Sequence, residues 1–312
     1  MLRSALLYLS NQPRVFRFVR NNRLAKRFAR RFVAGEALDD ALGAVRALND
    51  KGITASLDLL GESVTNEREA RAAGTAYVAM LDRIHAQGVD ANVSVKLTAM
   101  GLDISEDLCV DIMHDVLGRA QSLDSFVRLD MESTAYTERT LRLFEDRLYP
   151  TYKDHVGIVL QSYLYRTASD VERAIQLQCR VRLCKGAYKE PASLAFPQKR
   201  DVDANYLKCM QALLEHGNYP GIATHDPELI EAARRFVTER RIDRSRFEFQ
   251  MLYGVRRDLQ EQLVRDGYRM RVYVPFGTQW YPYLMRRLAE RPANVAFMTG
   301  NIVREMLPGR KQ

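Results

Sequence analysis

The chain has 312 residues, a net charge of +8 and 46% hydrophobic residues, which is enough for one large core or a barrel with additional helices. Its cysteines (Cys109, Cys179, Cys184 and Cys209) have no CxxC spacing and are too sparse for a disulfide scaffold, so we expect reduced thiols. No apolar run approaches the ~20 residues of a membrane span, and none is long enough for a signal-peptide core. These observations predict a cytoplasmic protein.

The first 35 residues are the most basic part of the chain, with nine lysines and arginines and no acidic residue. Within 13–33, apolar residues such as Val15, Phe18 and Phe32 recur at near-helical intervals among arginines. Amphipathic helices that pack on the main body explain this pattern, and a basic face for lipid or nucleic acid is the alternative. A second helical pattern covers 36–49. We therefore expect 1–50 to be a helical segment packed on a larger unit, 51–312.

Strand and helix patterns alternate regularly after Gly52. Apolar, β-branched runs predict eight strands, at 54–60, 92–99, 126–132, 156–163, 180–187, 221–226, 247–253 and 271–277. Helical patterns lie between them, at 65–87, 105–121, 134–147, 168–178, 203–216, 227–240 and 255–267. Such alternation predicts parallel strands and right-handed crossovers that close into a (β/α)8 TIM-like barrel. A doubly wound sheet is the alternative, but no GxGxxG motif follows any strand.

Polar residues near the carboxyl ends of the predicted strands are the candidate site, because barrel enzymes carry their chemistry there. Alternation along the strands points Lys96 and Asp130 into the barrel as neighbours, either as a structural ion pair or as groups that face a ligand. Arg182 lies in an apolar strand, so it requires an anion or a π system. An ion pair with Asp130 or Glu132 would satisfy that requirement without any ligand.

Three more strand ends carry binding candidates. Gln161 has both a donor and an acceptor, which suits the edge of a heterocycle. Gly186 follows the fifth strand and lets a ligand approach the backbone closely. After the sixth strand, Asp226 is the predicted N-cap of a helix with Pro227 at its first position, and the free N–H groups of such a turn suit a phosphate. His225 beside them, taken alone, is more often a structural residue than a catalytic one.

The last predicted helix carries an arginine pair. Offsets of three and four residues put Tyr283, Arg286, Arg287 and Glu290 on one face. Two adjacent guanidinium groups form a fork for a carboxylate, and the glutamate can hold them in place. A solvated surface helix with an ordinary salt bridge also explains this spacing.

Nine motifs between about Gly35 and about Glu305 resemble the proline dehydrogenase family, and closely its bacterial monofunctional branch. In chain order they are LDLLGE, SVKLTA, LDME, VLQSY, RLCKGAY, ATHD, FEFQMLYG, YVPFG and YLMRRLAE. The resemblance implies a distorted flavin-dependent (β/α)8 barrel over 51–312, with the final helix above the strand ends. It also implies oxidation of L-proline to 1-pyrroline-5-carboxylate by hydride transfer to FAD, with electrons passed to a quinone. That reaction is the first step of proline catabolism.

Site roles follow from the same motif matches. The resemblance implies catalytic roles for Asp130 and Arg182. It implies substrate contacts for Lys96, Ala187, Tyr188, Leu252, Tyr273, Tyr283, Arg286, Arg287 and Glu290. It implies cofactor contacts for Met131, Gln161, Arg182, Lys185, Gly186, Ala187, Thr224 and His225. It implies no metal site. Two positions depart from the family pattern: Lys189 replaces a tryptophan of the bifunctional branch, and Asp226 replaces a frequent asparagine.

Partners follow from the implied reaction. A membrane quinone as electron acceptor gives the basic N-terminal segment a use as a peripheral membrane contact, and the product suits a pyrroline-5-carboxylate dehydrogenase. A Schiff-base barrel lyase that uses Lys96 or Lys185 is the leading alternative chemistry. A nucleic-acid binder is a third hypothesis, but it leaves the interior charges unexplained, so we expect no nucleic-acid partner. The residues do not identify a general base.

Overall fold

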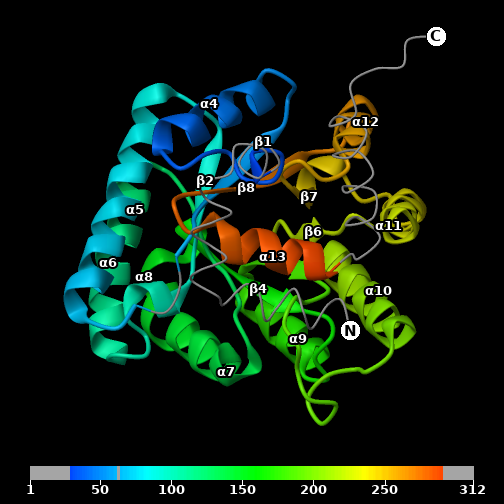
Figure 1. The fold of residues 1–312 in the computed structure, drawn as a ribbon. Coiled ribbons are helices and arrows are strands. Elements are labelled where there is room, and N and C mark those ends of the chain that lie inside the picture. Colours follow the sequence, from blue (N-terminus) through cyan, green and yellow to red (C-terminus); the bar gives the residue numbers. More distant parts are fainter. Residues whose placement is uncertain (1–28, 62–63, 291–312) are drawn as a thin grey trace, which may run out of the picture.

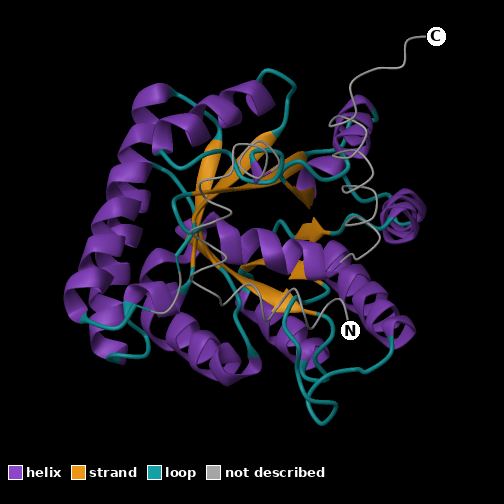
Figure 2. Ribbon diagram, in the orientation of Figure 1, coloured by secondary structure: helices purple, strands orange, loops and turns teal. Residues whose placement is uncertain are grey.

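The computed structural model of the chain describes residues 29–61 and 64–290, with side chains in that range as far as Met285. Its strands form one closed parallel barrel in sequential order, in which β8 pairs with β1. Helices surround the strands on the outside (Figures 1 and 2). This architecture confirms the predicted TIM-like (β/α)8 class, and the closed barrel excludes the open doubly wound sheet.

The elements alternate along the chain as the apolar pattern predicts. The strands are β1 (Thr54–Leu59), β2 (Ala91–Val95), β3 (Val127–Leu129), β4 (Val156–Gln161), β5 (Arg180–Cys184), β6 (Gly221–Ala223), β7 (Glu248–Leu252) and β8 (Met270–Phe276). The α-helices are α4 (Leu38–Asn49), α5 (Glu67–Gln87), α6 (Glu106–Ser122), α7 (Thr134–Leu143), α8 (Tyr149–Tyr152), α9 (Thr167–Leu177), α10 (Lys199–His216), α11 (Pro227–Glu239), α12 (Arg257–Arg265) and α13 (Trp280–Glu290).

Several strands end earlier than predicted. The prediction of a strand through Ala99 is wrong, because β2 ends at Val95 and Leu97–Met100 form a 3-10 turn, η1. Likewise β3 ends at Leu129 and β6 at Ala223. The loops at the carboxyl ends are themselves buried, as Leu97 is only 1% exposed. Apolar character therefore continues past the last strand residue and does not mark where the strand stops.

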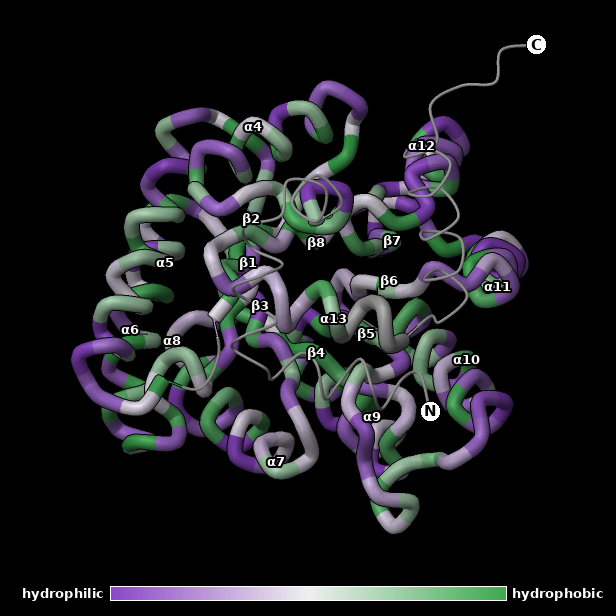
Figure 3. The backbone as a smooth tube through the Cα atoms, viewed as in Figure 1, coloured by the Kyte–Doolittle hydropathy of each residue, from purple (hydrophilic) through white to green (hydrophobic). Residues whose placement is uncertain are grey.

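Helix boundaries follow local capping chemistry. Asn66 caps α5 by accepting a hydrogen bond from the Glu69 N–H at 3.0 Å, and Gly88 ends the helix in the left-handed conformation. The predicted cap of α11 is confirmed, since Asp226 accepts from the Glu228 N–H and Pro227 occupies the first turn. Along the surrounding helices, hydrophobic and hydrophilic stretches alternate, as expected for helices with one face on a barrel (Figure 3).

The N-terminal region packs on the last strand as far as it is described. Helix α4 lies against β1 and β8, and the Ala34 N–H donates to the Pro275 carbonyl at 2.9 Å. Most of the predicted 13–33 helical pattern lies outside the described residues, so its role stays a prediction. None of the helices within 29–61 and 64–290 is long and apolar enough to cross a membrane. All four cysteines are free thiols, as expected.

Candidate active site

A cavity of about 490 Å³ lies at the carboxyl ends of the strands, within the roughly 300–1,000 Å³ typical of ligand pockets. It collects every predicted site residue whose side chain is described: Lys96, Asp130, Met131, Gln161, Arg182, Lys185, Gly186, Ala187, Tyr188, Thr224, His225, Leu252, Tyr273 and Tyr283. These residues come from strands far apart in the chain. Barrel closure is therefore what makes them neighbours.

Arg182 is held rigidly at the base of this cavity. It is 7% exposed, and its Nη1 donates to Asp130 Oδ1 at 2.7 Å. Its Nε donates to Gln250 Oε1 at 2.6 Å and its Nη2 to Ser94 Oγ at 3.1 Å. Of the two partners considered from sequence, Asp130 is the observed one, whereas Glu132 accepts from a threonine hydroxyl at 2.7 Å. The guanidinium has a fixed position while it also lines the cavity.

Lys96 bridges two carboxylates above Arg182. Its Nζ lies 3.0 Å from Asp58 Oδ1 and 3.9 Å from Asp130 Oδ2, so the Lys96–Asp130 pair expected from sequence is the longer of two. Burial and the charge of Asp130 raise the pKa of Asp58, and Lys96 opposes that shift. The Tyr273 hydroxyl donates to Asp130 Oδ2 at 2.7 Å, and burial together with Asp130 raises the pKa of Tyr273. The base of the cavity is thus a compact network of balanced charge.

Gln161 offers an unused acceptor to a ligand. The side chain is 4% exposed, and its Nε2 donates to the Met131 carbonyl at 3.4 Å. Its Oε1 has no hydrogen-bond partner among the described residues. A buried polar atom without a partner is destabilising unless a bound molecule supplies one. A heterocycle with an N–H group at this edge of the cavity would supply that hydrogen bond.

The loop after β5 packs closely against the Tyr163 ring. Gly186 has φ +111°, and a Cβ there would lie 2.4 Å from the Tyr163 ring, so a side chain is excluded. Lys185 forms ion pairs with Asp226 at 2.9 Å and Asp203 at 2.5 Å. Burial would raise the pKa of Asp226, but the hydrogen bond and charge of Lys185 hold it below its usual value. The added negative charge at Asp226 is therefore neutralised within the protein.

The remaining wall comes from the last described helix. Helix α13 crosses in front of the strands in Figure 1, and Tyr283, 6% exposed, lines the cavity from it. Arg286, Arg287 and Glu290 follow on the same helix, but their side chains lie outside the described residues. On the opposite wall, His225 Nε2 accepts from the Leu252 N–H at 2.9 Å, which fixes the tautomer of its imidazole.

Sequence reasoning missed two polar residues of the site, Asp58 and Gln250. Both line the cavity, Asp58 from β1 and Gln250 from β7. The strand alternation that identified Lys96 and Asp130 would have identified them as well, because Asp58 and Gln250 occupy inward positions of β1 and β7.

A parallel β/α barrel with a charged cavity at the carboxyl ends of its strands has the architecture of a barrel enzyme. The chain belongs to the proline dehydrogenase family, because the family model described as proline dehydrogenase matches residues 41–300. This match confirms the family resemblance.

Full-length relatives and a solved structure agree with that assignment. Proline dehydrogenase 1 of Bacillus subtilis subsp. natto is 41% identical, covering 98% of this chain and 100% of the relative. The proline dehydrogenase of Deinococcus radiodurans is 40% identical, covering 99% of each chain. The crystal structure of proline utilization A from Bdellovibrio bacteriovorus, inactivated by N-propargylglycine, matches with a TM-score of 0.79 and 28% identity, over 85% of this chain and 32% of that one. The first two relatives have this chain's own length, as expected for the monofunctional branch.

Proposed function

We propose that the chain oxidises L-proline to 1-pyrroline-5-carboxylate, with bound FAD as hydride acceptor and a quinone as the final electron acceptor. Family membership supports the substrate. The observation that carries the proposal is the cavity itself. In it, Arg182 is hydrogen-bonded to Asp130 and Lys96 to Asp58, and apolar and aromatic side chains form the rest of the lining. Balanced charge with an apolar wall suits a small zwitterion that has a hydrocarbon ring.

FAD supplies the hydride acceptor when bound. The residues that would hold it are Met131, Gln161, Arg182, Lys185, Gly186, Ala187, Thr224 and His225, all of which line the cavity. The unpartnered Gln161 Oε1 supports this assignment. This buried acceptor is destabilising unless a bound molecule donates a hydrogen bond to it.

The substrate carboxylate belongs with Arg286 and Arg287, and Glu290 braces that pair. Support comes from helix α13, where these residues follow Tyr283 at helical offsets and Tyr283 lines the cavity. A planar guanidinium fork binds a carboxylate through two hydrogen bonds, which fixes the ring in one orientation. Lys96, Ala187, Tyr188, Leu252 and Tyr273 complete the pocket around the ring.

Charge at two points explains why the site uses these residue types. The amine must be neutral when the hydride leaves, and like-charge repulsion from the arginine pair favours the neutral form. Arg182 keeps a fixed positive charge at the base of the cavity, where negative charge gathers on the acceptor, and Asp130 orients that guanidinium. Hydride abstraction is therefore assisted from both sides by side chains of this chain.

An absorbance scan of the purified protein tests the proposal directly. We expect a yellow protein with flavin bands that bleach when L-proline is added without oxygen. A colourless protein whose lysine is trapped by borohydride in the presence of substrate would instead establish the Schiff-base lyase. The ion pairs of Lys96 and Lys185 weigh against that lyase, because each ammonium is already bound by carboxylates.

A quinone acceptor implies access to the membrane surface, so the basic N-terminal segment is proposed as a peripheral contact. Co-sedimentation with anionic liposomes at low salt measures this contact, and failure to sediment removes it. The product is proposed to pass to a pyrroline-5-carboxylate dehydrogenase. Product trapping in the presence of such an enzyme measures whether transfer occurs.

A further inference from the structure

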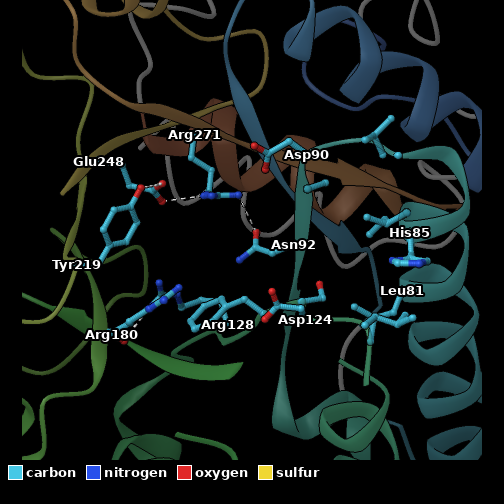
Figure 4. A pocket seen from close by; sticks show the side chains of 17 residues that line it. Leu81, His85, Asp90, Asn92, Asp124, Arg128, Arg180, Tyr219, Glu248 and Arg271 are labelled. Atoms are coloured by element: carbon cyan, nitrogen blue, oxygen red, sulfur yellow. Dashed lines mark hydrogen bonds and ion pairs between the residues drawn. The ribbon is translucent and has the colours of Figure 1, made fainter. Parts of the chain in front are cut away.

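A second cavity, of about 300 Å³, lies at the opposite, amino end of the barrel. Its polar lining comes from residues early in their strands, including Asn92, Arg128, Arg180, Glu248 and Arg271. Their side chains converge on one space in Figure 4. None of them lines the cavity at the carboxyl ends, so this is a separate place in the molecule.

Arg180 has no hydrogen-bond acceptor or ion pair for its guanidinium among the described residues. The guanidinium instead lies against two aromatic rings: its Cζ is 5.2 Å from the centre of the Phe126 ring and 5.6 Å from that of Tyr219. Its Nε is buried and unpartnered. The two rings fix the plane of the guanidinium while its donors stay unused, which is the arrangement of an anion-binding arginine.

Arg128 lies beside it and also lacks a carboxylate partner within the described range. The side chain is 3% exposed, and its Nη1 donates only to the carbonyls of Ile158 at 3.1 Å and Arg180 at 2.6 Å. Its Nε is a second buried donor without an acceptor. Burial lowers the pKa of Arg128 to about 9, and the positive charge of Arg182 adds to that shift. A buried cation in this state is stabilised by any anion that reaches it.

The acidic residues nearby form no ion pair with Arg128 or Arg180. Glu248 is fully engaged, since it accepts from Arg271 Nε at 2.7 Å, from Gln250 Nε2 at 2.6 Å and from the Tyr219 hydroxyl at 3.1 Å. Asp90 and Asp124 line the same cavity but are exposed to solvent. The lining as a whole carries three arginines and three carboxylates, but Arg128 and Arg180 form no ion pair among the described residues.

Two polar side chains complete the cavity. Asn92 uses its Oδ1 to accept from Ser56 and Arg271, and its Nδ2 has no acceptor among the described residues. Tyr219 holds its ring over Arg180 from a backbone with φ +47°, a conformation that is rare for a bulky side chain. The loop before β6 thus keeps an aromatic ring against the guanidinium of Arg180.

We propose that the amino-end cavity binds a small oxyanion, whose carboxylate or phosphate group lies against Arg128 and Arg180. The planar donor set of arginine matches either group through paired hydrogen bonds. The cavity is large enough for a molecule of a few carbon atoms or for inorganic phosphate. None of the residues assigned above to proline or to the flavin lines this cavity.

Titration of the flavin-loaded full-length chain with inorganic phosphate and with succinate, at ionic strength held constant with chloride, tests this site. We expect saturable binding by calorimetry and a matching rise in melting temperature for at least one of the two anions. Arg180→Gln should weaken that binding by about tenfold to a hundredfold, the loss expected for one charge-assisted hydrogen bond. Arg68→Gln, which removes one exposed arginine charge from α5, should leave it unchanged.

The arginine pair of α13 is the other place where an anion can bind, so Arg286→Gln is the second control. Binding that survives in Arg286→Gln and fails in Arg180→Gln supports the amino-end site. Binding lost in Arg286→Gln but kept in Arg180→Gln overturns it, as does stabilisation no greater than that by chloride. If Arg180→Gln fails to fold, Arg180→Lys replaces it, and undiminished binding in that variant also counts against the proposal. Phosphate binding without succinate binding identifies a phosphate site, and the reverse identifies a carboxylate site.

Discussion

The two ends of the barrel use the same strands but handle charge in opposite ways. At the carboxyl end, Asp58, Lys96, Asp130 and Arg182 pair with one another, so the network is balanced before any ligand arrives. At the amino end, Glu248 forms an ion pair with Arg271, whereas Arg128 and Arg180 form no ion pair among the described residues. A network of paired charges suits a zwitterion that must be oriented, whereas arginines without a carboxylate partner suit an anion.

Gln250 connects the two ends. Its Oε1 accepts from Arg182 Nε at 2.6 Å, and its Nε2 donates to Glu248 Oε1 at 2.6 Å. The position of Arg182 therefore depends in part on Gln250, which links it to Glu248 through the barrel interior. Substitutions that separate the ends test whether they act independently.

The largest effect is expected from Arg182→Met. Loss of a fixed positive charge where negative charge develops should slow reduction of the flavin by proline by about 10²–10³-fold, while proline still binds. Anaerobic stopped flow measures the rate and the binding constant together. Arg180→Met is the matched control on the same strand, two residues nearer the amino end, and should reduce the flavin at the wild-type rate. Equal losses in both variants would contradict the separation of the two ends.

Arg286→Lys should raise KM for proline by about tenfold to a hundredfold, because lysine cannot form the planar paired hydrogen bonds of arginine. Flavin content should stay at the wild-type level. Steady-state kinetics and the ratio of flavin to protein absorbance measure both quantities. An unchanged KM removes the carboxylate role from this residue.

Gly157→Ala tests packing at the amino end. A Cβ at this position would lie 2.4 Å from the Arg180 carbonyl and 2.7 Å from Arg128 Nη1. Overpacking of this kind should lower the free energy of unfolding by about 1–3 kcal/mol, measured by urea titration. Gly43→Ala is the control, because an added Cβ there meets nothing within 4 Å and the position is inside α4. That variant should be slightly more stable than the wild type, by about 0.5–1 kcal/mol.

The smallest effect is expected from Gln250→Leu. Arg182 loses the acceptor of its Nε but keeps its ion pair with Asp130. Because Gln250 acts only by positioning Arg182, flavin reduction should slow by about twofold to tenfold, less than the full value of one hydrogen bond to a charged group. KM should not change, which separates a positioning effect from lost substrate binding. Tyr219→Phe removes the 3.1 Å hydrogen bond to Glu248 and the hydroxyl that accepts from Arg269 Nη1 at 3.2 Å. Neither contact involves Arg182, so both constants should stay unaltered. A wild-type reduction rate in Gln250→Leu would mean that the hydrogen bond to Gln250 is not needed to position Arg182.

Many of the residues that line the cavity were predictable, because the local pattern of apolar and polar residues shows where the strands lie and which side chains point into the barrel. Alternation placed Lys96 and Asp130 inside the barrel, and the motifs named residues that line one cavity. The pairing was less predictable. Asp58 is the nearer partner of Lys96, and that depends on the register in which β1 joins β2 and closes on β8. The register depends on how strands far apart in the chain pair, so it cannot be predicted from any short segment of the sequence.

Local pattern along the chain was enough to establish the fold class, the element order and the end of the barrel that carries the chemistry, because hydrophobic period and capping act over a few residues. The amino-end cavity required the closed structure. Arg128, Arg180, Glu248 and Arg271 lie on four different strands and are ordinary charged residues in the sequence. Which of these charges finds a partner depends on distances across the barrel, and only barrel closure sets those distances.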